Sequence, residues 1–186
     1  MKLLGKGNHG CACLTDDGRV RKSTNDRREY DAACLLVGKD IPGVARVYHC
    51  SQGLDEEGNA RFLLVEERLQ MTTKGIGIKS KNRFMKCFKL SWCDYHERLA
   101  YKDRLACHNY IDFLFLCVRR RNKEHCDKAF SFFQKRTRSA AFVAMYHATC
   151  KTIAELYEQC PDVELDLDEG NFGFTEDGQM KFFDLL

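Results

Sequence analysis

The hydropathy pattern of this chain changes twice along its length, and that change restricts the fold more than any single motif. Up to about residue 69, short alternating or apolar segments are separated by turn signals, which predicts strands and one helix over 26–37. From about 84 to 159, apolar residues recur at helical spacing, and Pro161 predicts the end of the last helix. We therefore expect an α+β fold, in which an antiparallel sheet with one helix (1–69) precedes a mostly helical region (70–186).

The last part of the chain returns to short strand-like segments around an Asp-Gly pair, which favours a tight hairpin. With 186 residues and 44% hydrophobic content, the chain is long enough to bury a sizeable core. The expected strands are residues 11–14, 19–22, 45–50 and 61–67 before the helical region, and 163–167, 171–174 and 180–183 after it.

Composition argues against several classes of protein. No run of 18 apolar residues and no secretion signal occurs, so we expect neither a membrane span nor export, and we place the protein in the cytoplasm. Eleven cysteines, an odd number without an export signal, indicate reduced thiols rather than a disulfide scaffold. We also expect no structural zinc, because paired C-x-x-C spacing is missing. The candidate ligands are Cys93, His96, Cys107, His108, His125 and Cys126.

Positive charge is concentrated in the middle of the chain. The whole sequence has a net charge of +3, but residues 68–140 hold 18 Lys and Arg against 6 Asp and Glu. The most basic stretches are 79–86 and 119–138, and both include aromatic residues. RNA, DNA or an acidic protein partner could bind there, and a merely solvated helical surface is an equally good interpretation.

A glycine-rich run, Gly5-x-Gly7-x-x-Gly10, lies at the N-terminus. Dinucleotide-binding folds place such a run between a strand and a helix, but here the following residues predict strand, turn and strand. We therefore expect a flap between two antiparallel strands, whose backbone can approach phosphate groups because glycine has no side chain. The alternative is a flexible hairpin without a ligand.

Lys22 ends the second predicted strand, and Glu29 lies on the predicted helix that follows. In nucleotide sites with a glycine-rich flap, a lysine on this strand neutralises the α and β phosphates and a glutamate from the next helix holds it. Glu29 could instead form a capping box with Asp26. We favour the ion pair, because no other glutamate occurs before position 56.

Three polar residues near the end of the chain complete a pattern. Asp166 and Asn171 are five residues apart with Leu167 after the aspartate, as in the motif H-R-D-L-x-x-x-N, and Asp184 follows thirteen residues after Asn171. Together with the glycine flap, the strand lysine and the helix glutamate, these residues occur in the order found in protein kinases. The sequence therefore resembles the protein-kinase superfamily over nearly its whole length.

Within that superfamily, the chain most resembles the early serine/threonine kinases of T7-like bacteriophages, and a minimal kinase delivered by a bacterial pathogen would look similar. The shared stretches are "LGKG", "RVRK", "IPGVARVY" and the aspartate loop D-x-x-x-G-N. This resemblance implies an ATP-dependent transfer of the γ-phosphate to Ser or Thr of host proteins in the host cytoplasm. The transcription or translation machinery of the host is an expected target.

The resemblance also implies a role for each candidate residue and a need for ATP and Mg²⁺. ATP is expected in the cleft between the two lobes, next to a hinge over 66–69. In this scheme Gly5, Gly7 and Gly10 cover the phosphates, Lys22 binds them, Glu29 holds Lys22, and Glu67 contributes to nucleotide binding at the hinge; Asn171 and Asp184 hold Mg²⁺, and Asp166 orients the substrate hydroxyl and accepts its proton.

The sequence departs from the kinase pattern in two places. Glu164 and Leu165 stand where many kinases carry His and Arg, and Leu185 and Leu186 follow Asp184 where they carry Phe and Gly. No activation segment or later helices follow, so we expect a reduced or truncated helical lobe. Two alternatives follow from these departures: a pseudokinase that binds a host protein through its basic middle region, and a nucleic-acid-binding protein.

Overall fold

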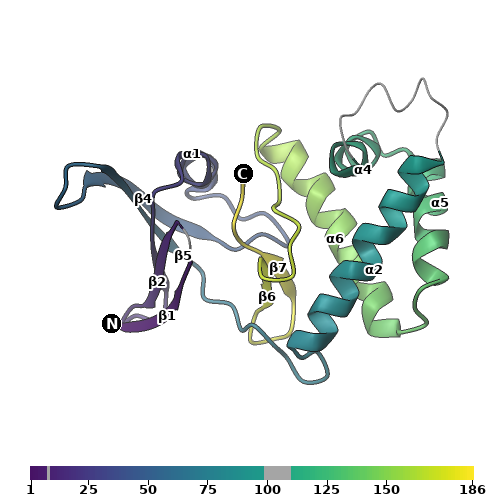
Figure 1. The fold of residues 1–186 in the computed structure, drawn as a ribbon, viewed down its shortest axis with the longest axis horizontal. Helices are drawn as coiled ribbons and strands as arrows, with labels where there is room; N and C mark the ends of the chain where they lie inside the picture. Colours follow the sequence, from purple (N-terminus) through teal and green to yellow (C-terminus); the bar gives the residue numbers. More distant parts are fainter. Residues whose placement is uncertain (8, 99–109) are drawn as a thin grey trace.

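The computed structural model describes residues 1–7, 9–98 and 110–186. An antiparallel sheet with one helix lies at one end, a group of helices lies at the other, and a short hairpin lies between them (Figure 1). The fold is therefore α+β with a sheet lobe and a helical lobe, as predicted. The sheet strands are β1 (Lys2–Lys6), β2 (Gly10–Leu14), β3 (Val20–Thr24), β4 (Val47–Leu54) and β5 (Ala60–Glu66).

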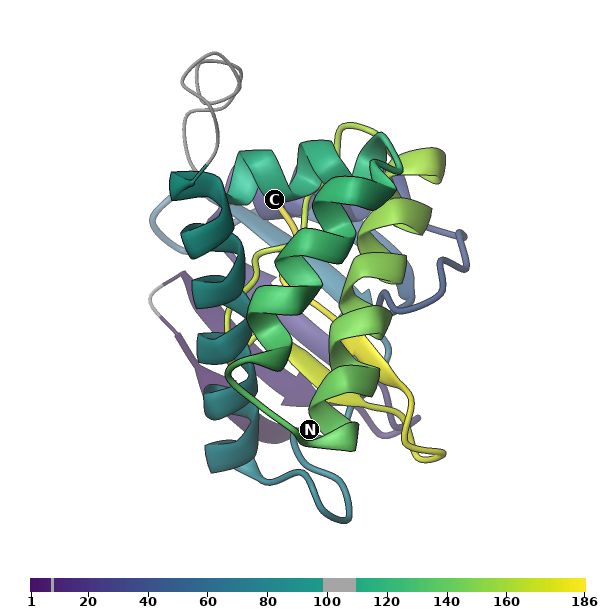
Figure 2. The ribbon, with the colours of Figure 1, turned by 90° about the vertical axis from the view of Figure 1, so that its right-hand side faces the viewer.

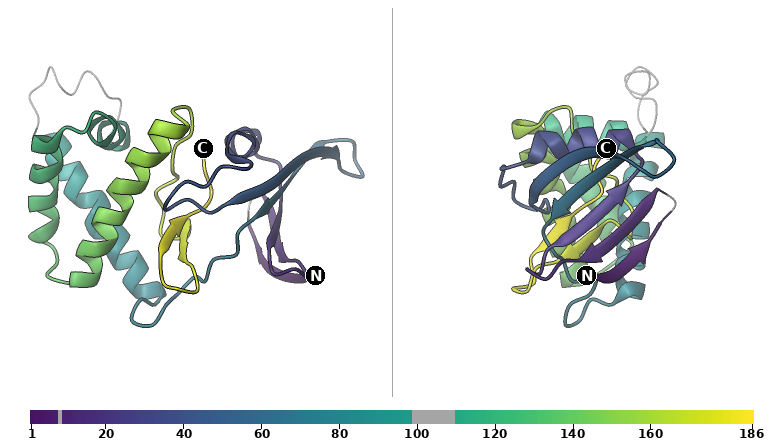
Figure 3. Two further views of the ribbon diagram at one scale, coloured as in Figure 1. Left: turned by 180° about the vertical axis from the view of Figure 1, so that it is seen from behind. Right: turned by 90° about the vertical axis from the view of Figure 1, so that its left-hand side faces the viewer.

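The five strands are ordered β1-β2-β3-β5-β4, and each neighbouring pair is antiparallel (Figure 3). Helix α1 (Arg27–Leu36) lies beside β4 and β5 and buries Ala32, Ala33 and Leu36. It begins after Asp26, whose side chain accepts a hydrogen bond from the Arg28 amide at 2.9 Å and so satisfies a free amide of the first turn. The prediction of one helix over 26–37 is confirmed.

Four described helices form the second lobe: α2 (Ile78–Glu97), α4 (Tyr110–Arg119), α5 (Lys123–Gln134) and α6 (Ala140–Gln159). Figure 2 shows them from the outer side, in front of the sheet. Helix α6 ends just before Pro161, as predicted, whereas α2 begins six residues before the predicted start at 84. Within the described residues, no helix is both long and apolar enough to cross a membrane.

An aromatic cluster joins the helices to the last hairpin. The ring centroid of Phe84 in α2 lies 5.7 Å from that of Phe142 in α6 and 6.2 Å from that of Phe172. Both ring pairs are in the edge-to-face arrangement. Phe84 and Phe172 are fully buried, and burial of each phenyl group contributes about 2 to 3 kcal/mol. Because Phe172 directly follows Asn171, the helical core fixes the position of one predicted site residue.

The last segment forms the hairpin of β6 (Phe172–Phe174) and β7 (Met180–Phe182), which confirms the hairpin predicted around the Asp-Gly turn. The strand predicted over 163–167 is wrong, because this segment makes only one isolated bridge, between Leu165 and Leu185. Burial nevertheless alternates along this segment, with Val163, Leu165 and Leu167 buried. The segment that contains Leu185 cannot continue this bridge into a regular β-ladder, because the neighbouring Asp184 has a left-handed backbone with φ of +60°.

The segment 43–45 of the sheet lobe is hydrogen-bonded to β7. The Ala45 amide donates to the Phe182 carbonyl at 2.7 Å, and the Phe182 amide donates to the Gly43 carbonyl at 2.8 Å. Gly43 has φ of +81°, and a Cβ atom there would lie 1.8 Å from Oγ1 of the buried Thr152 in α6. Gly43 therefore permits the close approach of the two lobes.

Replacing Gly43 with alanine should lower the free energy of unfolding by about 3 kcal/mol, because the methyl group meets both a left-handed backbone and a stiff buried threonine. Gly38→Ala is the matched control. Gly38 also has a left-handed φ, +77°, but its Cβ would meet nothing within 4 Å. That variant should lose about 1 kcal/mol in urea unfolding. Equal losses in the two variants would contradict the proposed clash.

Candidate active site

Lys22 lies at the centre of a three-residue contact. Its Nζ forms ion pairs with Oε1 of Glu29 and with Oδ1 of Asp184. The three residues come from β3, from the first turn of α1 and from the segment after β7. The predicted ion pair between Lys22 and Glu29 is thus present, and the structure adds Asp184 as a second partner.

The alternative role of Glu29, a capping box, is not formed. A capping box needs the glutamate to accept a hydrogen bond from the backbone amide of the N-cap residue. The Asp26 amide donates instead to Oγ1 of Thr24, at 3.1 Å. The side chain of Glu29 is therefore turned toward Lys22 rather than back to the start of its helix.

Burial and charge act against each other at this contact. The side chains of Lys22, Glu29 and Asp184 are 20%, 10% and 31% exposed. Burial opposes the charge on Lys22, but the two carboxylates outweigh it and raise the pKa of this lysine. Burial raises the pKa of Glu29, and Lys22 offsets only part of that effect. Lys22 therefore stays charged at any physiological pH.

Glu66, at the end of β5, belongs to the same cluster, and the sequence motifs did not predict this role for it. Lys22 lies opposite Leu64 of β5, and Val20 lies opposite Glu66. Residues two apart on a strand share a face, so Glu66 is the diagonal neighbour of Lys22. Burial raises the pKa of Glu66 to about 7, with repulsion from Glu29 and Asp184 adding to the effect and Lys22 reducing it.

The raised pKa of Glu66 predicts a pH-dependent stability. Between the ordinary glutamate pKa of 4.5 and about 7, the folded protein keeps a proton that the unfolded chain releases, so stability falls as pH rises through this window. Glu66→Gln removes the titration and should gain about 2 kcal/mol relative to wild type on going from pH 4.5 to pH 8. Urea unfolding at both pH values tests this. The exposed Glu56→Gln should show no such change, and the same result for Glu66→Gln would contradict the assignment.

Asp166 and Asn171 are held together by side-chain hydrogen bonds. Nδ2 of Asn171 donates to Oδ2 of Asp166 at 2.7 Å and to the Asp166 carbonyl at 3.3 Å. These contacts use the amide nitrogen, so the amide oxygen of Asn171 is left to accept a ligand. Burial raises the pKa of Asp166, and repulsion from Asp168 and Asp184 adds to the effect.

Backbone hydrogen bonds bring Asp184 next to this pair. The Asp166 amide donates to the Asp184 carbonyl at 3.3 Å, and the Phe183 amide donates to the Asn171 carbonyl at 2.9 Å. The left-handed φ of +60° at Asp184 is unfavourable for a residue with a side chain, and such outliers are concentrated at functional sites. The structure thus places Lys22, Glu29, Asp166, Asn171 and Asp184 in one connected network.

Two lysines of α2 contact the same loop and were not predicted. Nζ of Lys89 lies 3.5 Å from Oδ2 of Asp168. Lys81 is fully buried, and its Nζ donates to the carbonyl of Phe172. Burial lowers the pKa of Lys81 to about 8. Sequence spacing gives no signal for either contact, because both depend on how α2 packs against the hairpin.

The three glycines of the N-terminal flap lie at the ends of two paired strands, as predicted. A Cβ atom at Gly5 or Gly7 would meet nothing within 4 Å, so the backbone at these positions has open space. A Cβ at Gly10 would lie 1.7 Å from the carbonyl oxygen of Ser23. Glycine at position 10 is therefore also needed for the close approach of β2 to β3.

The carboxylate of Glu67 is occupied by other groups. Its Oε2 accepts hydrogen bonds from Nζ of Lys181 at 2.8 Å and from the Arg46 amide at 3.0 Å. The side chain thus joins β7 to the segment before β4. The Glu67 amide donates to the Arg46 carbonyl at 2.8 Å, and nucleotide binding by Glu67 stays a prediction. Leu165, where many kinases carry arginine, is 2% exposed and packs in the core.

The oxygen ligands available for a cation are few. Within 1–7, 9–98 and 110–186, no three side chains of His, Cys, Asp or Glu form a group that could hold a metal ion by themselves. Mg²⁺ usually takes one or two protein ligands and completes its shell with phosphates and water. The Asp184 carboxylate and the Asn171 amide oxygen fit that pattern.

Of the candidate zinc ligands, Cys107 and His108 lie outside the described residues.

No protein-family model matches this sequence. No curated protein matches it either. Among solved structures, the chain is similar to a MAP kinase from Leishmania major, with 12% sequence identity and a TM-score of 0.41. The alignment covers 99% of this chain and 44% of that chain, so this chain spans less than half the length of that kinase.

Proposed function

We propose that this protein is an ATP-dependent protein kinase that transfers the γ-phosphate of ATP to a serine or threonine hydroxyl of another protein. The observation that supports this best is the contact of Lys22 with both Glu29 and Asp184. It combines a phosphate-binding cation with the carboxylate that holds it and a carboxylate suited to Mg²⁺. The order of these residues along the chain is that of the kinase pattern.

The nucleotide is bound by residues of both lobes in this proposal. Lys22 contacts the α and β phosphates, and the backbone at Gly5 and Gly7 covers them, where the space beside each glycine is open. Asn171 and Asp184 would hold Mg²⁺, which neutralises charge on the phosphate groups when bound. Glu29 keeps Lys22 in place.

Asp166 acts on the acceptor hydroxyl. It orients this group for attack on the γ-phosphorus, and it takes the proton as the new O–P bond forms and the bond to the β-phosphate oxygen breaks. The raised pKa of Asp166 makes it a stronger base than an exposed aspartate. The hydrogen bond from Asn171 leaves the second carboxylate oxygen free for this role.

We further propose that the acceptors are proteins of a bacterial host and that the protein acts in the host cytoplasm during phage infection. The stretches "LGKG", "RVRK" and "IPGVARVY" and the aspartate loop support this narrower proposal. The first targets to examine are components of transcription and translation.

Binding of Mg-ATP is the first test of the nucleotide site. A ligand that binds only the folded state raises its stability, so the melting temperature should rise by about 5 °C at a hundredfold excess over Kd. EDTA should reduce the shift, and Asp184→Asn should do the same without EDTA. A melting curve unchanged by Mg-ATP at any concentration would contradict the nucleotide site and indicate a protein that binds no nucleotide.

A further inference from the structure

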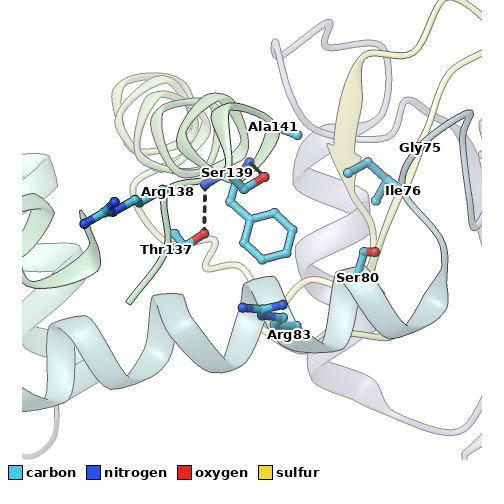
Figure 4. A pocket seen from close by; sticks show the side chains of 9 residues that line it. Gly75, Ile76, Ser80, Arg83, Thr137, Arg138, Ser139 and Ala141 are labelled. Carbon is cyan, nitrogen blue, oxygen red and sulfur yellow. Dashed lines mark hydrogen bonds between the residues drawn. The ribbon is translucent and has the colours of Figure 1, made fainter. Parts of the chain in front are cut away.

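A cavity separate from the candidate active site lies between the start of α2 and the start of α6. Its volume is about 330 Å³. Ser80 and Arg83 of α2 line one side and Thr137 and Ser139 line the other, with the ring of Phe142 as a wall (Figure 4). No residue of the Lys22 network lines it. The cavity thus has its own polar lining.

The two stretches of chain around this cavity contain basic residues but no acidic residue of their own. Residues 68–93 contain seven Lys and Arg and no Asp or Glu, and residues 128–154 contain five Lys and Arg and again no acid. These two stretches supply every residue of the cavity wall. No carboxylate from the wall can therefore neutralise its arginines.

The two arginines of the cavity are Arg83 and Arg138. Both are exposed, and neither forms an ion pair within the part of the chain that the structure describes. Arg83 lies on the side of α2 that borders the cavity, whereas the guanidinium of Arg138 is directed away from it (Figure 4). Arg136, by contrast, pairs with Asp94. Among the described residues, Arg83 and Arg138 thus remain available for an anionic ligand.

The basic surface continues along one side of α2. Lys79, Arg83 and Lys86 are spaced by four and three residues, which places them on one face of a helix. All three are exposed, and neither lysine has an acidic partner among the described residues. The exposed Ile78 and Leu90 border this row. The face thus combines cations with aliphatic side chains.

We propose that this cavity and the adjoining face of α2 bind an acidic segment of a partner protein. One anionic side chain, a carboxylate or a phosphorylated residue, enters the cavity and contacts Arg83, while neighbouring acids of the segment lie along Lys79 and Lys86. This row spans about 10 Å along the helix, which an extended peptide covers with three to four residues. Binding here does not depend on phosphate transfer.

The surface favours a peptide over RNA. Proteins that bind single-stranded RNA stack its bases on exposed aromatic rings. Phe142, the aromatic residue of the cavity wall, is 6% exposed and lies in the core. Ile78 and Leu90 instead offer contacts for apolar side chains of a polypeptide.

Fluorescence anisotropy with a labelled ten-residue peptide of alternating Glu and Ala tests this site, and the same peptide with one central phosphoserine distinguishes the two anions. We expect saturable binding at 50 mM NaCl, weakened at least fivefold at 300 mM. Arg83→Glu should weaken it about tenfold or more. Lys151→Glu is the control, because Lys151 is exposed on α6 about 18 Å along the helix from Ser139.

Three results would overturn the proposal: no binding of either peptide at 50 mM NaCl, equal weakening by Arg83→Glu and Lys151→Glu, or tighter binding of a ten-nucleotide single-stranded RNA through Arg83. Both substituted side chains are exposed, so the variants should melt like wild type. The assay contains no ATP, so a failure here is distinguishable from a failure of the proposed kinase activity.

Discussion

Replacing Lys22 with methionine should abolish Mg-ATP binding and lower the free energy of unfolding by about 2 kcal/mol at pH 8. Methionine keeps the length of the side chain but removes the charge that Glu29 and Asp184 share. Two carboxylates then face each other with Glu66 nearby. Phosphate transfer should fall by a factor of about 100 or more, because the cation that binds the phosphates is lost.

The pH dependence of this loss identifies its cause. The pKa values of Glu29 and Glu66 are already raised, so at pH 5 these groups can take up protons and relieve the repulsion. The loss of stability in Lys22→Met should therefore be smaller at pH 5 than at pH 8 in urea unfolding. Lys6→Met, on the exposed β1, should leave stability unchanged at both pH values. Equal losses for Lys22→Met at the two pH values would contradict a carboxylate cluster centred on Lys22.

Asp166→Asn should remove phosphate transfer while leaving Mg-ATP binding nearly intact. Asparagine cannot accept the proton of the acceptor hydroxyl, and loss of a general base lowers kcat by a factor of about 1000. The thermal shift with Mg-ATP should remain, since Lys22, Asn171 and Asp184 are unchanged.

Asp168→Asn is the matched control for this substitution. Asp168 lies on the same loop, and its carboxylate pairs with Nζ of Lys89, whereas the carboxylate of Asp166 accepts a hydrogen bond from the Asn171 side chain. The control should reduce kcat less than tenfold. If the two variants lost activity equally, the catalytic role would belong to the charge of the loop and not to Asp166.

Local sequence signals predicted the sheet lobe and the last hairpin well, because each signal was tied to short-range chemistry. Asp26 caps α1, and the Asp-Gly turn forms the last hairpin, as their residue types favour. The order of Lys22 and Glu29 along strand and helix was enough to predict their ion pair. In each case, the determining residues lie within a few positions of one another.

The errors arose where long-range packing decides. Val163, Leu165 and Leu167 are buried as in a strand, but a strand also needs a partner, and the left-handed backbone at Asp184 interrupts the pairing. The role of Glu66 in the Lys22 cluster was not predicted, whereas nucleotide binding by Glu67 stays a prediction. The register of β5 against β3, which places Glu66 beside Lys22, cannot be inferred from composition.

The contacts of α2 with the last hairpin were also beyond sequence reasoning. Lys81 and Phe172 are ninety-one residues apart in sequence, and only the packed helical lobe brings them together. A buried lysine that has no acid partner in the described part of the chain contradicts the usual preference of lysine for the surface. Residue type therefore gave no indication of this contact.

Transfer of phosphate from ATP is the most direct test of the proposed activity. Purified wild-type protein and Asp166→Asn should be incubated with Mg²⁺, γ-labelled ATP and a bacterial protein extract, and the labelled proteins should be mapped by mass spectrometry. We predict phosphoserine or phosphothreonine in the wild-type reaction and almost none with Asp166→Asn. A wild-type protein that binds Mg-ATP in the thermal melt yet places no phosphate on any protein would contradict the kinase assignment, and would show a nucleotide-binding protein without transfer.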